Sequence, residues 1–242
     1  MKRVLGSSAW KLIDLLHPRI QALLISTLKS GPVKRGRGTY IHGSVQILGK
    51  KYVSIGAHSV LSQECWLNVN HRNGIETAIQ IGSYCFLGRR NFFSSGKKIV
   101  LGDYILTAND CHFLGSSHVV QNPMLPYLSS GTTDSDVITI GHNTFIGAGA
   151  SILGNVNVGH GSVIGARSLV NRDVPPFSQV VGAPARVVRR YSMRKAAWVP
   201  SGEFFDEDEQ QHPSAEQYLG ILQQCPRARM PYIAAGSDMG QC

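Results

Sequence analysis

Branched aliphatic residues recur every six positions, without a break, between residues 138 and 170. The series consists of Ile140, Ile146, Ile152, Val158, Ile164 and Val170. An α-helix returns apolar residues to one face about every 3.6 positions and a strand every second position, so a period of six fits neither element. The pattern predicts a coil with three short strands per turn, in which one side chain per strand points to the axis and stacks on its equivalents.

A second periodic position supports this interpretation. The residue two places before each inward aliphatic is small or β-branched, as in Thr144, Ala150, Val156, Ser162 and Ser168. A narrow triangular interior has no room for two large side chains at one level. A glycine follows several inward residues, where a sharp corner would crowd a Cβ atom.

The cysteines follow the same frame. Cys65, Cys85 and Cys111 fall at the small interior position of earlier turns, whereas Cys225 and Cys242 lie beyond the repeat. Their number is odd and no CxxC spacing occurs. We therefore expect buried thiols in a reducing compartment, not a disulfide framework or a zinc site.

The period delimits three parts of the chain. Residues 39–190 are predicted to form the coil, and residues 115–136 are expected to leave it as a long loop of the kind that usually carries function. Residues 1–38 are predicted to form a helical segment followed by a basic linker. Residues 191–242 are expected to be a mostly irregular, partly flexible extension, with a solvated acidic run at 203–211 and a short helix at 214–224.

The helical segment has two interpretations. Apolar residues at helical spacing between Ser7 and Lys29 suit a helix that covers the open end of the coil or packs on a neighbouring subunit. They also suit a helix lying in the plane of a membrane, because basic residues flank them. Peripheral membrane contact through residues 1–30 therefore stays open.

Charge and hydropathy limit the partners and the location. The net charge of +9 favours an anionic partner, such as a phosphate-bearing cofactor or an anionic membrane surface. The basic residues are scattered and no aromatic-rich nucleic-acid motif accompanies them, so nucleic acid is not expected. There is no apolar run of spanning length and no signal peptide, so a cytoplasmic location, extending to the inner face of the membrane, is expected.

Three segments carry a family resemblance: IGHNTFIGAGASIL from Ile140, VIGARSLVNRDVPP from Val163 and VVGAPARVVRR from Val180. Together they resemble the hexapeptide-repeat acyltransferases, and among these most of all the O-acetyltransferases of galactosides, maltose and capsular or colanic-type polysaccharides. The resemblance implies an all-β fold, a left-handed parallel β-helix, that assembles as a homotrimer. It also implies acetyl-coenzyme A as acyl donor. His112 and His118 could suggest a metal site, but no third ligand is evident in the sequence, so no metal is expected.

The resemblance also implies a catalytic base. In the polysaccharide-modifying branch, a coil that starts with an I-G-D-x-V pattern runs on to the catalytic histidine at the mouth of the loop. Residues Leu101–His118, LGDYILTANDCHFLGSSH, reproduce that pattern without a gap, so His118 is the matching position. Transfer of an acetyl group from a thioester to an alcohol needs such a base, and an imidazole suits the task at neutral pH. His112, one hexapeptide earlier, is the alternate base. His118 could also be an exposed loop histidine without a catalytic role.

The same resemblance implies binding residues. Those for the pantetheine arm are Gly147, Ala148, Gly165 and Ala166, through backbone groups, and those for the adenosine and phosphate end are Asn171, Arg172 and Arg189. Corner geometry explains the glycines equally well, and each arginine also suits a solvated surface charge. The sugar-binding Asn and Asp of galactoside-type enzymes align with Gly88 and Gly96, which puts a galactoside acceptor in doubt. Asn91 and Ser94 lie near the same level and are candidates for acceptor binding or for a purely structural role.

Three functions remain open on the sequence. The leading one is acetyl-coenzyme A-dependent O-acetylation of a sugar hydroxyl in a cell-surface polysaccharide or its lipid-linked precursor. N-acylation of an amino sugar is the alternative within the family, since an amine can react without a histidine base. A non-catalytic β-helix that serves as a scaffold or binding module is the alternative outside enzymology.

Overall fold

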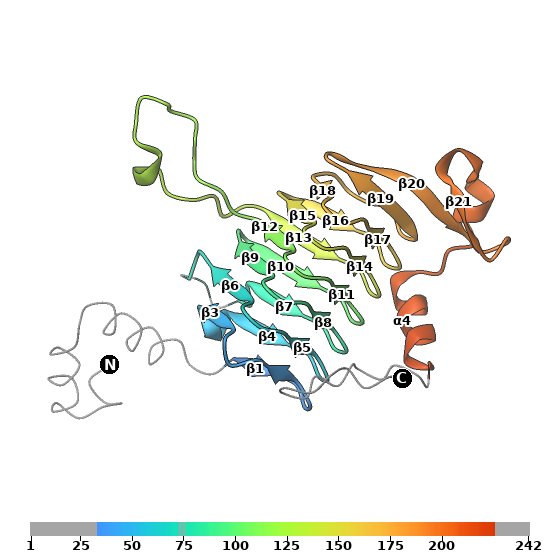
Figure 1. Cartoon of the computed structure of the whole chain (residues 1–242), viewed down its shortest axis with the longest axis horizontal. Helices are drawn as coiled ribbons and strands as arrows, with labels where there is room; N and C mark the ends of the chain where they lie inside the picture. The colour runs from blue at the N-terminus through green and yellow to red at the C-terminus, as the bar shows by residue number, and fades with distance from the viewer. Residues whose placement is uncertain (1–32, 73, 75, 226–242) are drawn as a thin grey trace, which may run out of the picture.

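The computed structural model describes residues 33–72, 74 and 76–225, which build a triangular prism of stacked turns (Figure 1). Sheet A consists of β1 (Lys34–Arg35), β4 (Val53–Ile55), β7 (Ile79–Ile81), β10 (Lys98–Leu101), β13 (Val137–Ile140) and β16 (Val156–Val158). Sheet B consists of β2 (Tyr40–Ile41), β5 (Val60–Leu61), β8 (Phe86–Leu87), β11 (Leu106–Thr107), β14 (Phe145–Ile146), β17 (Val163–Ile164), β19 (Ser178–Gly182), β20 (Ala185–Ser192) and β21 (Ala197–Pro200). Sheet C consists of β3 (Gln46–Leu48), β6 (Trp66–Val69), β9 (Phe92–Ser95), β12 (His112–Leu114), β15 (Ser151–Leu153) and β18 (Leu169–Val170).

The chain visits sheets A, B and C in turn, so each strand pairs in parallel with the strand one turn away. Leu101, Ile140 and Val158 lie in register in sheet A, and Phe113, Ile152 and Val170 do so in sheet C. In sheet B, Thr107, Ile146 and Ile164 form the equivalent column. All of these side chains are buried. The predicted parallel coil with one inward residue per strand is confirmed.

The corners between the sheets explain the glycines of the repeat. A Cβ atom built on Gly141 would overlap the backbone of His160 in the next turn, and one on Gly147 would lie 2.6 Å from the backbone nitrogen of Ala166. Side chains cannot fit between backbone layers at this spacing. We call the three edges of the prism the A–B, B–C and C–A edges, after the sheets that meet there.

The small interior position is also filled as predicted. Cys65, Cys85 and Cys111 are completely buried. Burial raises the pKa of Cys85 to about 12 and the pKa of Cys65 and Cys111 to about 11. These thiols stay protonated at physiological pH and serve as small core residues.

At the N-terminal side the coil begins earlier than residue 39, because β1 already pairs with β4 through Lys34 and Arg35. A short 3-10 helix, η1 (Lys50–Tyr52), lies between β3 and β4, where the first turn passes into the second. The helix expected within residues 7–29 lies outside the described residues. Within the part of the chain that the structure describes, no helix has the length and apolar character needed to span a membrane.

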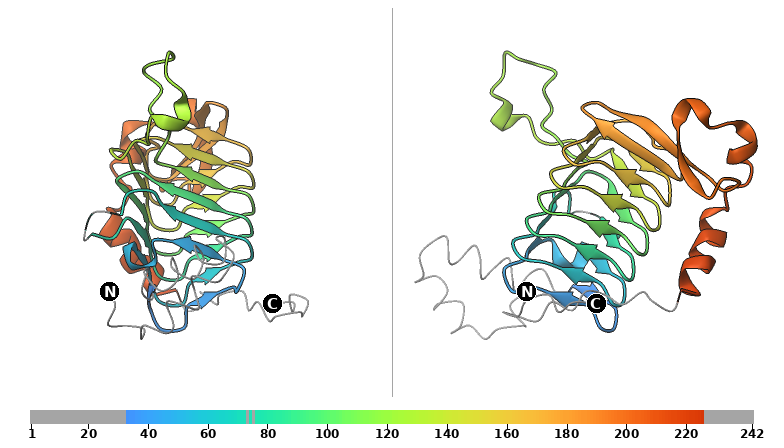
Figure 2. Two further views of the ribbon diagram at one scale, coloured as in Figure 1. Left: turned by 90° about the vertical axis from the view of Figure 1, so that its left-hand side faces the viewer. Right: turned by 45° about the vertical axis from the view of Figure 1, so that its right-hand side comes forward.

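The loop expected at residues 115–136 leaves the prism between β12 and β13, at the C–A edge. Figure 2 shows it as a long arm that projects from the body, on the side away from helix α4 (Ala215–Gln223). A 3-10 turn, η2 (Tyr127–Ser129), lies near its tip. We refer to residues 115–136 as the arm.

The C-terminal part is more regular than expected beyond Arg190. Strands β19, β20 and β21 pair antiparallel and extend sheet B past the last turn of the coil. A 3-10 helix, η3 (Ser201–Glu203), and a short helix, α3 (Asp206–Glu209), follow, and then α4, whose N-cap Ser214 forms a capping box with Gln217. These elements form what we call the C-terminal extension.

One residue of the C-terminal extension differs from the sequence-based expectation. The acidic run is not uniformly solvated, because Asp208 is completely buried and its carboxylate accepts hydrogen bonds from Ser192 and Arg194.

Hydrogen bonds at the A–B edge join the C-terminal extension to the coil. The amide of Asn143 donates to the hydroxyl of Tyr218 at 2.6 Å. Nε2 of His160 donates to the carbonyl of Pro213 at 3.1 Å. The extension is therefore docked on the coil by defined hydrogen bonds.

The stacked core predicts a large loss of stability when one inward side chain is removed. The rings of Phe93 and Phe113 stack with centroids 4.4 Å apart, and both side chains are completely buried. We expect Phe113→Ala to lower the free energy of unfolding by about 3–5 kcal/mol, the usual cost of truncating a buried aromatic. Chemical denaturation measures this. Gln80→Ala, at an exposed outward position of sheet A, is the control and should stay within about 0.5 kcal/mol of the wild type.

The docking of the extension should depend on pH through His160. Burial lowers the pKa of His160, and the nearby His142 and His212 act in the same direction, while the hydrogen bond to Pro213 opposes them. Because the folded pKa lies below that of the unfolded chain, at about 6.5, the unfolded chain binds more protons between these values. The contribution of His160 to stability is then full above about pH 6.5 and falls as the pH drops toward the folded pKa.

Thermal unfolding between pH 7.5 and pH 5.5 checks this. We expect the wild type to lose more thermal stability over this interval than His160→Gln, which keeps a donor for Pro213 but does not titrate. Equal losses in the two proteins would contradict the assignment.

Candidate functional site

The base of the arm is a short antiparallel ladder. The backbone nitrogen of Thr133 donates to the carbonyl of Ser117 at 2.8 Å, and His118 forms a bridge with Thr132. The hydroxyl of Ser116 donates to the carbonyl of Thr133 at 2.7 Å. Nε2 of His71, in the loop after β6, lies 3.0 Å from the same carbonyl and donates to it. The backbone that carries His118 is therefore braced against the coil.

The side chain of His118 projects from this braced base. It is exposed, and among the described residues no group of the same chain makes a hydrogen bond to its imidazole. Both ring nitrogens are thus open to a substrate or to a second chain. A catalytic histidine usually has a partner that orients it, and none is found here within one chain.

His112, the alternate base, has a different environment. It lies on the outward side of β12, is half-buried, and has Nδ1 3.3 Å from the hydroxyl of Ser151 on the neighbouring strand. Asp110, the nearest acid in sequence, is engaged elsewhere, because it forms a two-pronged ion pair with Arg90 at 2.7 and 2.8 Å. This hydrogen-bonded guanidinium lowers the pKa of Asp110. Asp110 is therefore the partner of Arg90 in this chain.

The residues expected to hold pantetheine form a ledge on the B–C edge. Ala148 and Ala166 are exposed and lie one above the other, since the backbone nitrogen of Arg167 donates to the carbonyl of Ala148 at 2.8 Å. The nitrogens of Gly147 and Gly165 are used in the coil itself. Within the described residues, the N–H groups of Ala148 and Ala166 have no protein acceptor. The ledge thus offers two stacked donors to a ligand carbonyl or oxyanion.

The three residues expected at the phosphate end of the donor are exposed but not gathered in one chain. Asn171 and Arg172 follow β18 and lie at the C–A edge, on the same edge as His118. Arg189 lies on β20, opposite Gln179, in the extension of sheet B. The width of sheet C separates the ledge from Asn171 and Arg172, so one protomer does not bring all of these groups to one point.

The structure corrects the interpretation of the acceptor residues. Asn91 is completely buried, and both ends of its amide are engaged, since it donates to the hydroxyl of Thr107 and accepts from the backbone nitrogen of Cys111. It has a structural role and does not face a substrate. Ser94 is also buried, and its hydroxyl accepts a hydrogen bond from the amide of Asn70 at 2.9 Å.

Gly88 and Gly96, where galactoside-type enzymes carry polar side chains, cannot hold side chains here. A Cβ atom at Gly88 would overlap the carbonyl of Ala108, and one at Gly96 would overlap the carbonyl of Gly115.

Sequence reasoning missed an aromatic pair on the outward side of sheet C. Trp66 and Phe92 lie in register with His112 on successive strands, and their ring centroids are 4.9 Å apart. The side chain of Trp66 is 41% exposed. The period of six could have predicted that these three residues share an outward face, because each directly precedes an inward residue. Sheet C thus carries the ledge at one edge, after β14 and β17, and His118 at the other edge, after β12, while the aromatic pair lies on its outward face in the earlier turns of β6 and β9.

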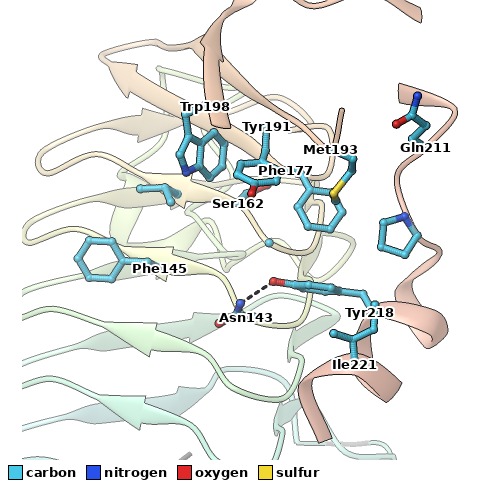
Figure 3. Close-up of a pocket in the computed structure, with 13 residues that line it drawn as sticks. Asn143, Phe145, Ser162, Phe177, Tyr191, Met193, Trp198, Gln211, Tyr218 and Ile221 are labelled. Carbon is cyan, nitrogen blue, oxygen red and sulfur yellow. Dashed lines mark hydrogen bonds between the residues drawn. The ribbon is translucent and has the colours of Figure 1, made fainter. Parts of the chain in front are cut away.

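A separate groove lies on the other side of the molecule (Figure 3). It has a volume of about 750 Å³ and is bounded by Phe145 and Val163 of sheet B and by Tyr191, Trp198 and Ile221 of the C-terminal extension. None of the residues predicted for catalysis or binding lines it. Among the described residues, no three His, Cys, Asp or Glu side chains gather in an arrangement that could hold a metal ion.

Comparison with known proteins places the repeat. The family described as bacterial transferase hexapeptide (six repeats) matches residues 138–172. A probable acetyltransferase of Mycobacterium tuberculosis is 29% identical over 197 residues, which cover 79% of this chain and 58% of that protein. The match thus spans less than two thirds of the length of this relative. A serine acetyltransferase of Staphylococcus aureus is 29% identical over 182 residues, covering 74% of this chain and 73% of that protein.

A solved structure shares the fold. The crystal structure of AntD, an N-acyltransferase from Bacillus cereus in complex with dTDP and 3-hydroxybutyryl-CoA, superposes with a TM-score of 0.55 at 18% identity. The superposition covers 71% of this chain and 87% of that one. The resemblance to the hexapeptide-repeat acyltransferases that the sequence predicts is therefore confirmed, and with it the left-handed parallel β-helix.

Proposed function

We propose that this protein is an acetyl-coenzyme A-dependent O-acetyltransferase that modifies a sugar hydroxyl of a cell-surface polysaccharide or its precursor, with His118 as general base. The observation that carries the proposal is the position of His118. Its imidazole is exposed on a braced backbone at one edge of sheet C, opposite a ledge with two unused N–H groups at the other edge. Acyl transfer requires a base and an oxyanion donor at one carbonyl, and His118 and these N–H groups are of the two kinds required.

The reaction follows from these parts. The acceptor hydroxyl oxygen attacks the thioester carbonyl carbon while an imidazole nitrogen of His118 takes the hydroxyl proton. The oxyanion that develops on the carbonyl is stabilised by backbone N–H donors of the coil. The carbon–sulfur bond then breaks, the acetyl group stays on the acceptor oxygen, and the proton passes from the imidazole to the thiolate of coenzyme A.

We propose that this chemistry takes place in a homotrimer, and the polarity of the three faces of the prism is the argument for it. Outward residues of sheet A are polar apart from the half-buried Val100 and Val137, whereas sheet B exposes Leu106 and Phe145 and sheet C exposes Leu153. In the homotrimer that we propose, unlike faces B and C meet in a heterologous contact, and three copies close into a ring. Such packing turns the B–C edges inward and leaves sheet A in solvent.

This assembly also accounts for the scattered donor residues. The ledge at the B–C edge, Arg172 at the C–A edge and Arg189 above sheet B lie apart in one chain. In the proposed ring, face C of one protomer lies against face B of the next, so Arg189 of one chain comes near Arg172 of another. Cations at this boundary suit the phosphate groups of coenzyme A.

The acceptor is proposed to lie on the aromatic surface of sheet C in the turns of β6 and β9, outside the contact that Leu153 makes in the turn of β15. Buried Asn91 and the crowded Gly88 and Gly96 offer no polar side chain for a sugar. The exposed ring of Trp66 instead offers an apolar surface on which a sugar ring can pack, next to Phe92 and His112.

We expect His118→Ala to fold normally and to lose about 10²-fold or more in transfer rate, the usual contribution of a general base. Steady-state assays with acetyl-coenzyme A and a hydroxyl acceptor measure this. Coenzyme A affinity should stay near the wild-type value, because the ledge is unchanged. Near-normal turnover would contradict the assignment, and a comparable loss in His112→Ala alone would move the base to His112.

Controls separate the alternatives. Paired hydroxy and amino acceptors distinguish O-acylation from the N-acylation of an amino sugar, for which removal of His118 should matter little. A scaffold without catalytic activity predicts no rise in the thermal midpoint with acetyl-coenzyme A, whereas the proposed enzyme should show one.

We expect Trp66→Ala to raise KM for the acceptor about 10-fold, corresponding to about 1.4 kcal/mol of lost packing, with little change in KM for acetyl-coenzyme A. Initial-rate kinetics with each substrate varied in turn measure this. Gln80→Ala, exposed on the polar sheet A, is the control. Equal effects on both KM values would argue against an acceptor surface at Trp66.

A further inference from the structure

The tip of the arm presents large apolar side chains to solvent. Met124 is 87% exposed and Leu128 is 92% exposed, and Val120 and Leu125 are each 57% exposed. The tip is nevertheless an ordered turn, because the backbone nitrogen of Ser129 donates to the carbonyl of Pro126 at 2.9 Å. An ordered, projecting apolar surface of this kind marks a contact site.

The groove in Figure 3 has the complementary character. It is lined by Phe145 and Val163 of sheet B and by Tyr191, Trp198, Tyr218 and Ile221 of the C-terminal extension. No residue that lines it is charged, and Phe145 and Ile221 are 40% and 58% exposed. Its volume of about 750 Å³ is large enough for several side chains.

The arm cannot reach this groove in its own chain. The arm leaves the prism at the C–A edge, whereas the groove lies at the A–B edge and over sheet B. Figures 1 and 2 show the arm and helix α4, which carries Ile221 of the groove, on different sides of the body. The arm and the groove lie at similar levels along the prism. The arm leaves after β12 and rises toward the end of the prism where β18 to β20 lie (Figure 1). The groove lies on β14 and β17, in the next two turns.

We propose that the arm tip of one protomer inserts into the groove under the C-terminal extension of the neighbouring protomer. This rests on the ring of the proposed function. When face C of one chain packs on face B of the next, the C–A edge of the first lies beside the A–B edge of the second. The arm and the groove then meet at the outer border of the interface, and docking fixes the arm base that carries His118.

A second copy of the chain suits the tip better than a membrane does. Residues 115–136 contain no Lys or Arg and include Asp134 and Asp136, so the arm has no attraction to anionic lipid. Both the tip and the groove are uncharged, which matches an interface core between copies.

Cross-linking between chains tests the docking. One chain carries Leu128→Cys and the other Ile221→Cys, both with Cys225→Ser and Cys242→Ser, and the two are co-expressed with different tags and treated with a short bismaleimide. We expect a prominent species that contains one chain of each kind. Replacing the second chain with one that carries Gln80→Cys, exposed on sheet A, is the matched control and should give little of it.

Activity provides the second arm of the experiment. We expect Leu128→Asp and Ile221→Asp each to lower the transfer rate about 10-fold, and the double variant to lose little more, because both remove one contact. Gln121→Asp, exposed on the same arm, should retain the wild-type rate.

Several outcomes would overturn the docking. One is that Leu128→Cys cross-links equally to Ile221→Cys and to Gln80→Cys. Another is that the losses of rate in the double variant are fully additive. A third is that no cross-link forms, while the wild type binds anionic vesicles and Leu128→Asp abolishes that binding. Light scattering and the His118→Ala assay separate the failures. A trimer without the cross-link refutes only the docking, a monomer refutes the ring as well, and the assay reports on the chemistry alone.

Discussion

The stacking of inward side chains in a narrow triangular interior governs this molecule. Each inward residue packs on its equivalent in the turns above and below, as the rings of Phe93 and Phe113 do at 4.4 Å. This spacing leaves no room for a Cβ between backbone layers at corners such as Gly141. The position of a segment outside the prism, such as the arm, is therefore set by the turn of the coil from which it leaves. His118 lies where it does because the period stops after β12 and resumes at β13.

The period of six predicted most of this arrangement, because it reports directly on which side chains share an axis. It placed Ile140 and Ile146 in their columns, the thiols inside, and the arm at residues 115–136. It could also have corrected the acceptor assignment. Asn91 stands two places before the inward Phe93, at the same small interior position as Cys111 before Phe113. An amide in that position is buried and must be satisfied by the coil, as it is here.

Other features could not be predicted, since they depend on contacts between distant segments. Strand β20 is regular because β19 offers it a free edge above the last turn, and β21 in turn pairs with β20. Asp208 is buried because Ser192 and Arg194 lie beside it, and no local pattern separates it from its exposed acidic neighbours. The outward residues of the strands fall between these cases. Their positions are periodic, but which face forms a contact depends on the whole column, as with Trp66, Phe92 and His112.

A three-sided prism also explains why the residues proposed for the site do not converge in one chain. Each face is flat, so groups on two edges of the same sheet, such as Ala148 and Arg172, point apart instead of converging. A cleft requires a second surface, and the polar sheet A is the least suited to provide one. Faces B and C are apolar and share an edge, so two prisms that meet through them enclose a wedge open toward the arm and the C-terminal extension. In the proposed assembly, the binding site would form between two chains, and the arm and the C-terminal extension would close it.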